Sequence, residues 1–294
     1  MYKIKINIGS IIILVLLVAC SKKTINKPEP LEAINSASVA FKYKGNSLGE
    51  FFQNPSKAYI SGYFYFDDTL ADDVVFGLDI EWLEGLDNPI HFQGADWMAL
   101  AGFTRKGVLW FPVGSPVNVT GTPTNTDKWE MRDTGTELRP NSWYKITIEA
   151  DFEKREFTSV RLEGNGSDIL VDISGYPLEY PNYIPLDKPT LTFYTFALRS
   201  KEFALANDRE TKVFFDDIEG GIIKGSEKQI VFSNGFEHQH KIEEMPIVLP
   251  VTALNTIQED FWYFENENAK ITIVSTIKRS GNNAIECNAD LKND

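Results

Sequence analysis

Two carboxylates stand two residues apart in the segment Leu78-Asp79-Ile80-Glu81-Trp82-Leu83. Apolar residues alternate with them, which is typical of a β-strand, where side chains return to the same face every two residues. Asp79 and Glu81 are therefore expected to share one face, where paired carboxylates can bind sugar hydroxyls or exchange protons with a substrate. The competing interpretation is that both acids cover the solvent side of an antiparallel sheet.

Tryptophan side chains are the second group that suits a ligand, because the C–H face of a sugar ring packs on a flat aromatic ring. Trp97, after Gln93-Gly94-Ala95-Asp96, and Trp129, after Thr126-Asp127-Lys128, stand in polar, loop-like surroundings. These two are predicted to bind ligand. Trp82 and Trp143 stand in apolar alternation and are predicted to lie in the core.

Short segments rich in Val, Ile, Phe, Tyr and Thr must position these residues, and none of them keeps helical spacing over a long stretch. The predicted strands cover 59–66, 74–82, 108–113, 143–150, 158–163, 190–198 and 212–218. Many short strands separated by Gly and Pro turns predict an all-β sandwich or barrel.

The N-terminal residues have the pattern of a targeting signal. Lys3 and Lys5 precede an apolar run, Ile11 to Ala19, that is too short to span a bilayer comfortably and stops at Cys20. The stretch Leu17-Val18-Ala19-Cys20 resembles a bacterial lipobox, which implies that residues 1–19 are a signal peptide. By that resemblance Cys20 is lipidated and anchors the protein in the cell envelope, at the outer membrane and on a face that the sequence leaves open. Residues 20–37, polar and poor in large apolar side chains, are expected to form a flexible tether.

Charge and cysteine content exclude several classes of protein. The net charge of −13 becomes −15 if Lys3 and Lys5 are removed with the signal peptide, so nucleic acid is not an expected partner. Only Cys20 and Cys287 are present, and lipidation of Cys20 leaves Cys287 without an intramolecular partner. The hydrophobic core, rather than disulfides, must therefore stabilise the fold.

Two sequence patterns carry a resemblance to a fold family. The run Asn141-Ser142-Trp143-Tyr144-Lys145-Ile146 and the later run Val213-Phe214-Phe215-Asp216-Asp217-Ile218 resemble those of concanavalin A-like (laminin G-like) jelly-roll domains, such as occur in Bacteroidetes-type lipoproteins. The resemblance covers 38–224 and implies a concanavalin A-like jelly-roll sandwich of antiparallel strands, a fold that most often binds glycans.

Asp216 and Asp217 are adjacent in a predicted strand, so one of them is expected to point inward and to need a partner. The resemblance to laminarinase-like jelly rolls implies a structural calcium ion on an Asp of this strand, and Asp216 is the predicted ligand. A hydrogen-bonded structural Asp is the alternative. His238 and His240 lack further ligands at zinc spacing, so a metalloenzyme is not expected.

The strand of Asp79 and Glu81 resembles the catalytic strand of lichenase-like glycoside hydrolases, with the pattern E-I-D-I-E-F-L. Asp79 and Glu81 match the second and third acids, but Gly77 stands at the place of the nucleophile. The resemblance therefore implies a site that has lost its covalent step or serves another purpose. A bulged register that uses Glu84 as the third acid is the other alignment.

The C-terminal segment, 225–294, is expected to be rich in β-structure. Ile230 to Glu237 and Arg279 to Glu286 resemble the opening strands of a further jelly-roll domain, as in polysaccharide lyases. Two alternatives stay open: the segment is the start of a truncated second domain, or it completes or flanks the first one.

The sequence as a whole predicts a membrane-anchored envelope lipoprotein that binds or captures polysaccharide without cleaving it. A polysaccharide lyase or glycoside hydrolase of jelly-roll type is the first alternative, and His91, Gln93, Tyr194 and Arg199 are of the types that a lyase uses. A structural or adhesion protein of the envelope is the second.

Overall fold

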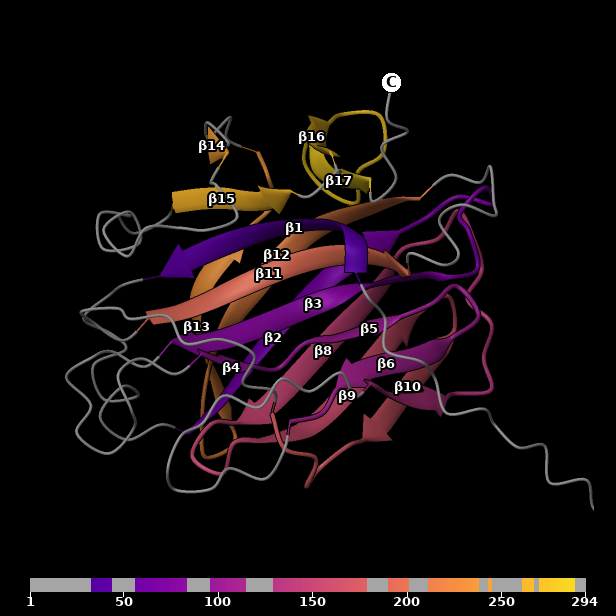
Figure 1. Ribbon diagram of the computed structural model, residues 1–294. Coiled ribbons are helices and arrows are strands. Elements are labelled where there is room, and N and C mark those ends of the chain that lie inside the picture. Colours follow the sequence, from indigo (N-terminus) through magenta and orange to yellow (C-terminus); the bar gives the residue numbers. More distant parts are fainter. Residues whose placement is uncertain are drawn as a thin grey trace, which may run out of the picture.

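The structure of the protein is a computed structural model that describes residues 33–43, 56–83, 96–114, 129–178, 190–200, 211–237, 243–244, 261–266 and 270–288. Its elements are β-strands, and they form two sheets that pack face to face (Figure 1). The predicted all-β sandwich is confirmed. No helix long and apolar enough to cross a membrane occurs among the described residues.

Nine strands form the first sheet, here called sheet A. In spatial order they are β14 (Glu243–Glu244), β15 (Phe261–Asn266), β1 (Ala33–Tyr43), β11 (Thr190–Ser200), β3 (Val74–Leu83), β5 (Ala101–Phe103), β6 (Val108–Pro112) and β7 (Trp129–Asp133), with β4 (Asp96–Met98) paired to β3. Strands β14 and β15 run parallel, and the other neighbours are antiparallel.

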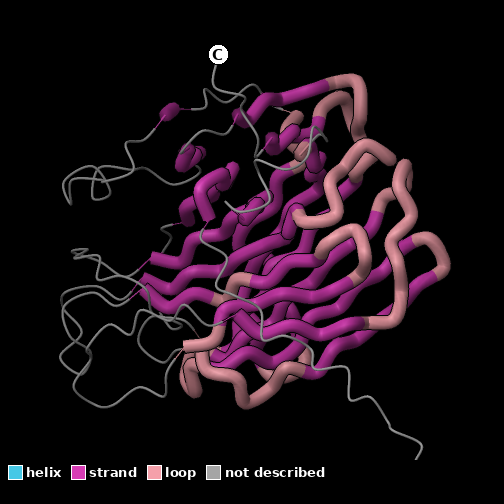
Figure 2. The backbone as a smooth tube through the Cα atoms, turned by 45° about the vertical axis from the view of Figure 1, so that its right-hand side comes forward, coloured by secondary structure: helices cyan, strands magenta, loops and turns pink. Residues whose placement is uncertain are grey.

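Eight strands form the second sheet, here called sheet B. In spatial order they are β10 (Ser167–Asp172), β9 (Glu156–Gly164), β8 (Tyr144–Asp151), β2 (Lys57–Tyr65), β12 (Lys212–Lys224), β17 (Ala284–Asn288) and β16 (Lys270–Val274), with β13 (Glu227–Asn234) paired to β12. All of these neighbours are antiparallel. Figure 2 shows the strands of the two sheets as stacked layers.

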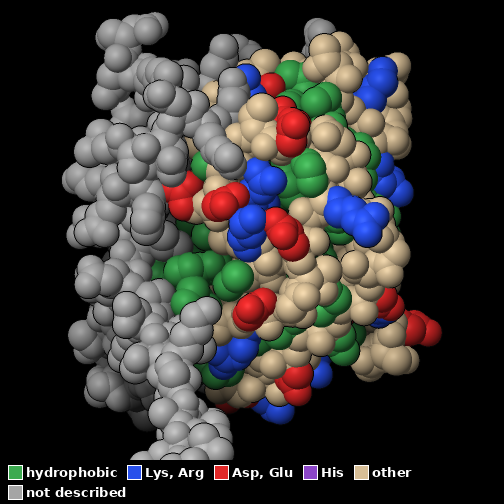
Figure 3. All heavy atoms as spheres, turned by 90° about the vertical axis from the view of Figure 1, so that its right-hand side faces the viewer, with side chains coloured by type: hydrophobic (Ala, Val, Ile, Leu, Met, Phe, Trp, Pro, Cys, Tyr) green, Lys and Arg blue, Asp and Glu red, His purple; other side chains and the backbone are tan. Residues whose placement is uncertain are grey.

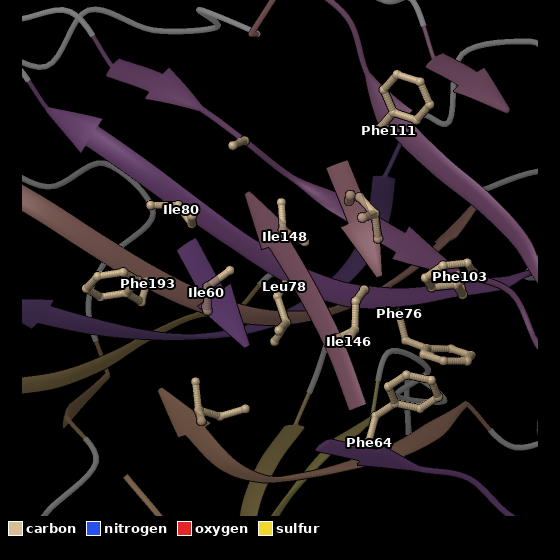
Figure 4. Packing of buried hydrophobic residues seen from close by; sticks show 14 of the residues in the cluster. Ile60, Phe64, Phe76, Leu78, Ile80, Phe103, Phe111, Ile146, Ile148 and Phe193 are labelled. Carbon is tan, nitrogen blue, oxygen red and sulfur yellow. The ribbon is translucent and has the colours of Figure 1, made fainter. Parts of the chain in front are cut away.

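The core lies between the sheets and follows from strand alternation. Leu78 and Ile80 of β3 face Ile146 and Ile148 of β8, and all four are completely buried (Figure 4). The rings of Phe64 and Phe76 meet with their centroids 4.8 Å apart. Burying each such side chain contributes about 1.5–3 kcal/mol to folding, so this interior is a main source of stability.

All seven strands predicted from apolar alternation are present, with ends that differ by a few residues. Trp82 lies in the core as predicted. Trp143 does not: it precedes β8, is partly exposed, and packs against Tyr65 with ring centroids 5.4 Å apart. The next residue, Tyr144, takes the buried position instead, so the inward face of β8 is shifted by one residue from the prediction.

Described strands from the N-terminal and the C-terminal parts of the chain take part in the sandwich. Strand β1 begins at Ala33, inside the segment expected to be a tether, because its backbone pairs with β11 on one side and β15 on the other. The C-terminal strands join both sheets: β17 pairs with β12, and β15 pairs with β1. Ile285 and Cys287 of β17 are buried in the common core, so these strands belong to the same sandwich.

Candidate functional site

The face of sheet A that turns away from sheet B carries the side chains that could bind a ligand or take part in catalysis. Leu78 and Ile80 point into the core, so Asp79 and Glu81, which alternate with them on β3, lie on this outer face. The antiparallel register places Tyr194 opposite Asp79 and Thr192 opposite Glu81. The outer face of sheet A therefore collects two acids and two hydroxyl groups at the centre of the sheet.

These polar groups are shielded from water. Asp79 is 3% exposed, Glu81 9%, Tyr194 9% and Thr192 2%. The Thr192 hydroxyl donates to the backbone oxygen of Glu81 at 3.3 Å and to its carboxylate Oε2 at 3.5 Å. The shared face was predicted, and it is the outer face of the sheet, as in the competing interpretation, but both acids are covered instead of exposed to water. In such a low-dielectric setting, hydrogen bonds and charges act more strongly than in water.

Gly77, the residue at the place of a glycosidase nucleophile, has a structural reason to lack a side chain. It pairs with Gly102 of β5, and a Cβ atom at Gly77 would lie 2.1 Å from the backbone oxygen of Ala101 and 2.5 Å from the Gly102 Cα. Real Cβ atoms do not approach backbone atoms so closely. The paired glycines therefore keep a third carboxylate away from this face.

Two tryptophans lie on the same outer face of sheet A, on the neighbouring strands β6 and β7. Trp110 of β6 and Trp129 of β7 meet edge to face, with ring centroids 6.5 Å apart, and both are partly exposed. They pack against Val75, Phe196 and Leu198 on the outer face of sheet A. The Trp110 indole nitrogen is buried and has no hydrogen-bond partner among the described residues.

Of the two tryptophans predicted to bind ligand, only Trp129 lies on this face, and it begins a strand instead of lying in a loop. Trp97 does not lie where its polar neighbours predicted. It belongs to β4, pairs with Trp82, and is 2% exposed in the core cluster. The Arg155 guanidinium lies 4.5 Å from the Trp97 ring centroid. The polar residues before this short strand led to the wrong prediction, because the Trp97 ring points into the core.

Trp110 and Thr192 are site residues that the sequence interpretation did not select. Their signal was present in the strand alternation: Leu109 and Phe111 are completely buried, so Trp110 between them must face outward.

Asp216 lies at a β-bulge in β12, where Asp217 takes a left-handed backbone conformation with φ of 48°. Its carboxylate is fully buried and accepts backbone N–H groups from Asp217, Arg279 and Ser280 at 2.7, 2.8 and 3.1 Å. Burial raises the pKa of Asp216, and the hydrogen bonds from Ser280 and Arg279 oppose that rise. Three protein N–H groups thus donate to this carboxylate, as in the structural alternative.

Several candidates lie outside the described residues: Cys20, Glu84, His91, Gln93, His238 and His240. Arg199 lies at the end of β11. In the part of the chain that the structure describes, no group of three or more His, Cys, Asp and Glu side chains forms a metal-binding cluster.

Comparison with known proteins gives no family. No family model and no curated protein matches the chain. Among solved structures, Scytalido-glutamic peptidase matches 87% of this chain and 98% of its own at 10% identity and a TM-score of 0.34. The PL-14 alginate lyase from Aplysia kurodai matches 49% and 70% at 10% identity and 0.28, and an alginate lyase from Pseudomonas aeruginosa matches 54% and 64% at 7% identity and 0.24. Likeness at this level does not extend to activity.

Proposed function

We propose that the protein binds a glycan on the outer face of sheet A without cleaving it. One observation carries the proposal: two shielded carboxylates, Asp79 and Glu81, lie on the same sheet face as the partly exposed pair Trp110 and Trp129. Carbohydrates need both kinds of group, since their hydroxyls donate to carboxylates and their C–H faces pack on aromatic rings.

Gly77 supports binding rather than cleavage by a covalent route. A retaining glycosidase needs a carboxylate nucleophile as well as an acid/base carboxylate. Gly77 stands at the position that matches the nucleophile of lichenase-like glycoside hydrolases. The backbone of β5 occupies the space that any side chain would take there.

The binding test compares two tryptophans on opposite sheets. A form starting at Ser21 keeps every described strand and is screened on a polysaccharide array, and affinities for the hits are then measured by calorimetry. Trp110→Ala is expected to weaken binding about tenfold or more, in line with the 1–3 kcal/mol typical of an aromatic anchor. Trp143→Ala, beside sheet B, serves as the matched control and is expected to change affinity little. Equal effects of the two variants would place the glycan elsewhere.

A hydrolase is the second candidate, because Asp79 and Glu81 supply two carboxylates on one strand face. In glycoside hydrolases one such group protonates the leaving oxygen and the other acts as base or nucleophile. Every glycan that binds is therefore assayed for new reducing ends and for unsaturated products that absorb in the ultraviolet. If the wild-type protein forms product and Glu81→Gln does not, the protein is an enzyme and the capture proposal is wrong.

We also propose that Cys20 is lipidated and holds the protein at the outer membrane of the cell envelope. The lipobox-like run Leu17 to Cys20 supports this proposal. Metabolic labelling with an alkyne fatty acid is expected to tag the wild-type chain and not Cys20→Ser. Equal labelling of the wild-type chain and Cys20→Ser would show that Cys20 is not the lipidated residue.

The structural calcium ion expected at Asp216 stays a prediction of the sequence. Because three N–H groups already donate to this carboxylate, we expect the melting temperature to be the same in calcium and in EDTA. A melting temperature several degrees higher in calcium than in EDTA would show that the folded protein binds calcium.

A further inference from the structure

We infer that Asn165, at the tip of the hairpin that joins β9 to β10, is a site of covalent modification by water, in which its side-chain amide is replaced by a carboxylate. The inference does not depend on the proposed glycan binding. Its basis is the step Asn165-Gly166, one of two Asn-Gly steps in the sequence, and the different surroundings that the fold gives to the two steps.

The reaction joins an asparagine side chain to the backbone that follows it. The backbone nitrogen of the next residue loses its proton and attacks the amide carbon Cγ, and the Cγ–Nδ2 bond breaks to release ammonia. Water then opens the resulting five-membered succinimide ring at either of its two carbonyl carbons. The products are aspartate and isoaspartate, in which the main chain runs through Cβ and Cγ. Each event consumes one water and releases one ammonia.

The surroundings of Asn165 leave room for this reaction. Gly164 pairs with Ser167, so Asn165 and Gly166 form a two-residue turn, and their φ angles of 49° and 82° are typical of a type I′ turn. Both residues are exposed, and a Cβ atom at Gly166 would meet no atom within 4 Å. The Asn165 amide donates to the Tyr144 hydroxyl at 3.3 Å, a long hydrogen bond. The attacking nitrogen is therefore uncrowded, and a hairpin tip opens more easily than the core.

The second step, Asn234-Gly235, is protected by the fold. Asn234 ends β13, pairs with Ile218 of β12 and is partly buried. Its side-chain oxygen accepts the backbone N–H group of Phe236 at 2.6 Å, which holds the amide in place. A Cβ atom at Gly235 would lie 3.2 Å from Asp217 Oδ1. A carboxylate so near disfavours the deprotonated nitrogen that must attack, so strand pairing and charge both slow this step.

Modification of Asn165 is expected to act on its hairpin rather than on the charge of the whole surface. On the side of the molecule shown in Figure 3, Lys and Arg side chains lie interspersed with Asp and Glu side chains. The chain already carries a net charge of −13, so one more carboxylate changes the surface field little.

The isoaspartate product, in contrast, adds one carbon to the main chain of a two-residue turn. Because turn type and loop length fix the register of a hairpin, the longer turn disturbs the pairing of β9 with β10. One contact that depends on this register is the ion pair of Arg161 on β9 with Asp168 on β10, at 2.6 Å. Strand β10 is therefore expected to loosen in the isoaspartate form.

The experiment follows both Asn-Gly steps in one sample of the full chain, purified in detergent. The protein is kept at neutral and at mildly alkaline pH, digested at intervals and analysed by mass spectrometry, in which each event adds about 1 Da to a peptide. The Asn165 peptide is expected to convert at least about tenfold faster than the Asn234 peptide, because Asn234 must first be freed from its strand. The rate is expected to rise with pH, since the attacking nitrogen must lose a proton.

The same chain unfolded in urea is the control. Without the fold the two Asn-Gly peptides are expected to convert at similar rates, because both contain the same pair of reacting residues. A ratio of rates in the folded chain no larger than that in urea would overturn the inference. So would a folded chain in which neither peptide converts while both convert in urea.

The variant Asn165→Asp separates the effect of charge from that of the longer turn. It carries the same charge as the isoaspartate form but keeps the ordinary main chain. The isoaspartate form, isolated by chromatography, is expected to exchange the backbone amide hydrogens of β10 faster than Asn165→Asp does. Equal exchange in the two would show that β10 tolerates the longer turn and would overturn the expected effect on the hairpin.

Discussion

Individual carboxylates tie the C-terminal loop before β17 to the rest of sheet B. Asp216 accepts the backbone N–H groups of Arg279 and Ser280, and Asp217 accepts the Ser280 hydroxyl at 2.9 Å and pairs with the Arg279 guanidinium. That guanidinium also lies 3.5 Å from the ring centroid of Tyr63 on β2. The two acidic residues of the bulge thus act on one loop from neighbouring positions, which ordinary strand alternation would have placed on opposite faces.

Glu237 provides a pH test of this attachment. It accepts the backbone N–H groups of Asn282 and Asn283 at 2.8 and 3.1 Å, and these bonds, Asn282 foremost, lower the pKa of Glu237 below its ordinary value of 4.5. A carboxylate with a lowered folded pKa stabilises the fold above its unfolded pKa and loses that contribution as the pH falls through its folded pKa. Glu237→Gln is therefore expected to lower the melting temperature at pH 7, with the difference from wild type shrinking below about pH 4.5.

Melting curves by circular dichroism between pH 7 and pH 3 measure this difference. Glu153→Gln, at an exposed position, is the control and should track the wild type throughout. A difference between Glu237→Gln and wild type that stays constant over the whole range would show that the charge of Glu237 does not stabilise the loop.

At the scale of the strand, Gly77 and Gly102 allow β3 and β5 to pair closely. Gly77→Ala is expected to destabilise the fold by about 1–3 kcal/mol or more, because the backbone of β5 cannot yield to a Cβ atom without disturbing the ladder. Gly62→Ala in β2 is the matched control. There the added methyl meets the end of the flexible Ile218 side chain, 2.1 Å away, which can change its rotamer.

Urea unfolding monitored by tryptophan fluorescence gives both free energies of unfolding. Gly77→Ala should lose clearly more stability than Gly62→Ala. Equal losses would mean that the pairing of β3 with β5 adapts as easily as a side chain does.

Strands with a strong apolar alternation were predictable, and shorter or more polar strands were not. The alternation of apolar residues from Val74 to Trp82 predicts both the inward face of the strand and the shared face of Asp79 and Glu81. In contrast, β4 has three residues behind a polar run, and β1 is held by partners on both sides that are distant in sequence. The bulge at Asp216 also escaped prediction, because it depends on the left-handed conformation of Asp217, a residue type that tolerates it only occasionally.

At the scale of the whole molecule, the C-terminal strands complete the sandwich. Phe232 of β13, Phe236, and Ile285 and Cys287 of β17 all enter the main core cluster. A chain that ends at Gly225 is therefore expected to lose cooperative unfolding, since it exposes the edge of β12 and the core beneath it. Calorimetry and size-exclusion chromatography test this expectation. A monomeric, cooperatively melting truncated chain would show that the first strands form a domain by themselves.

The position of β17 also has a consequence for the timing of folding. Strand β12 lies between β2 and β17, and β1 lies between β11 and β15, so both sheets join strands from opposite ends of the chain. Pairings so distant in sequence form slowly, because large loops must close before the contacts are gained. The sandwich is therefore expected to close after synthesis rather than during it. If Cys20 is lipidated as proposed, this interval lets the chain pass through a membrane channel while it is still unfolded.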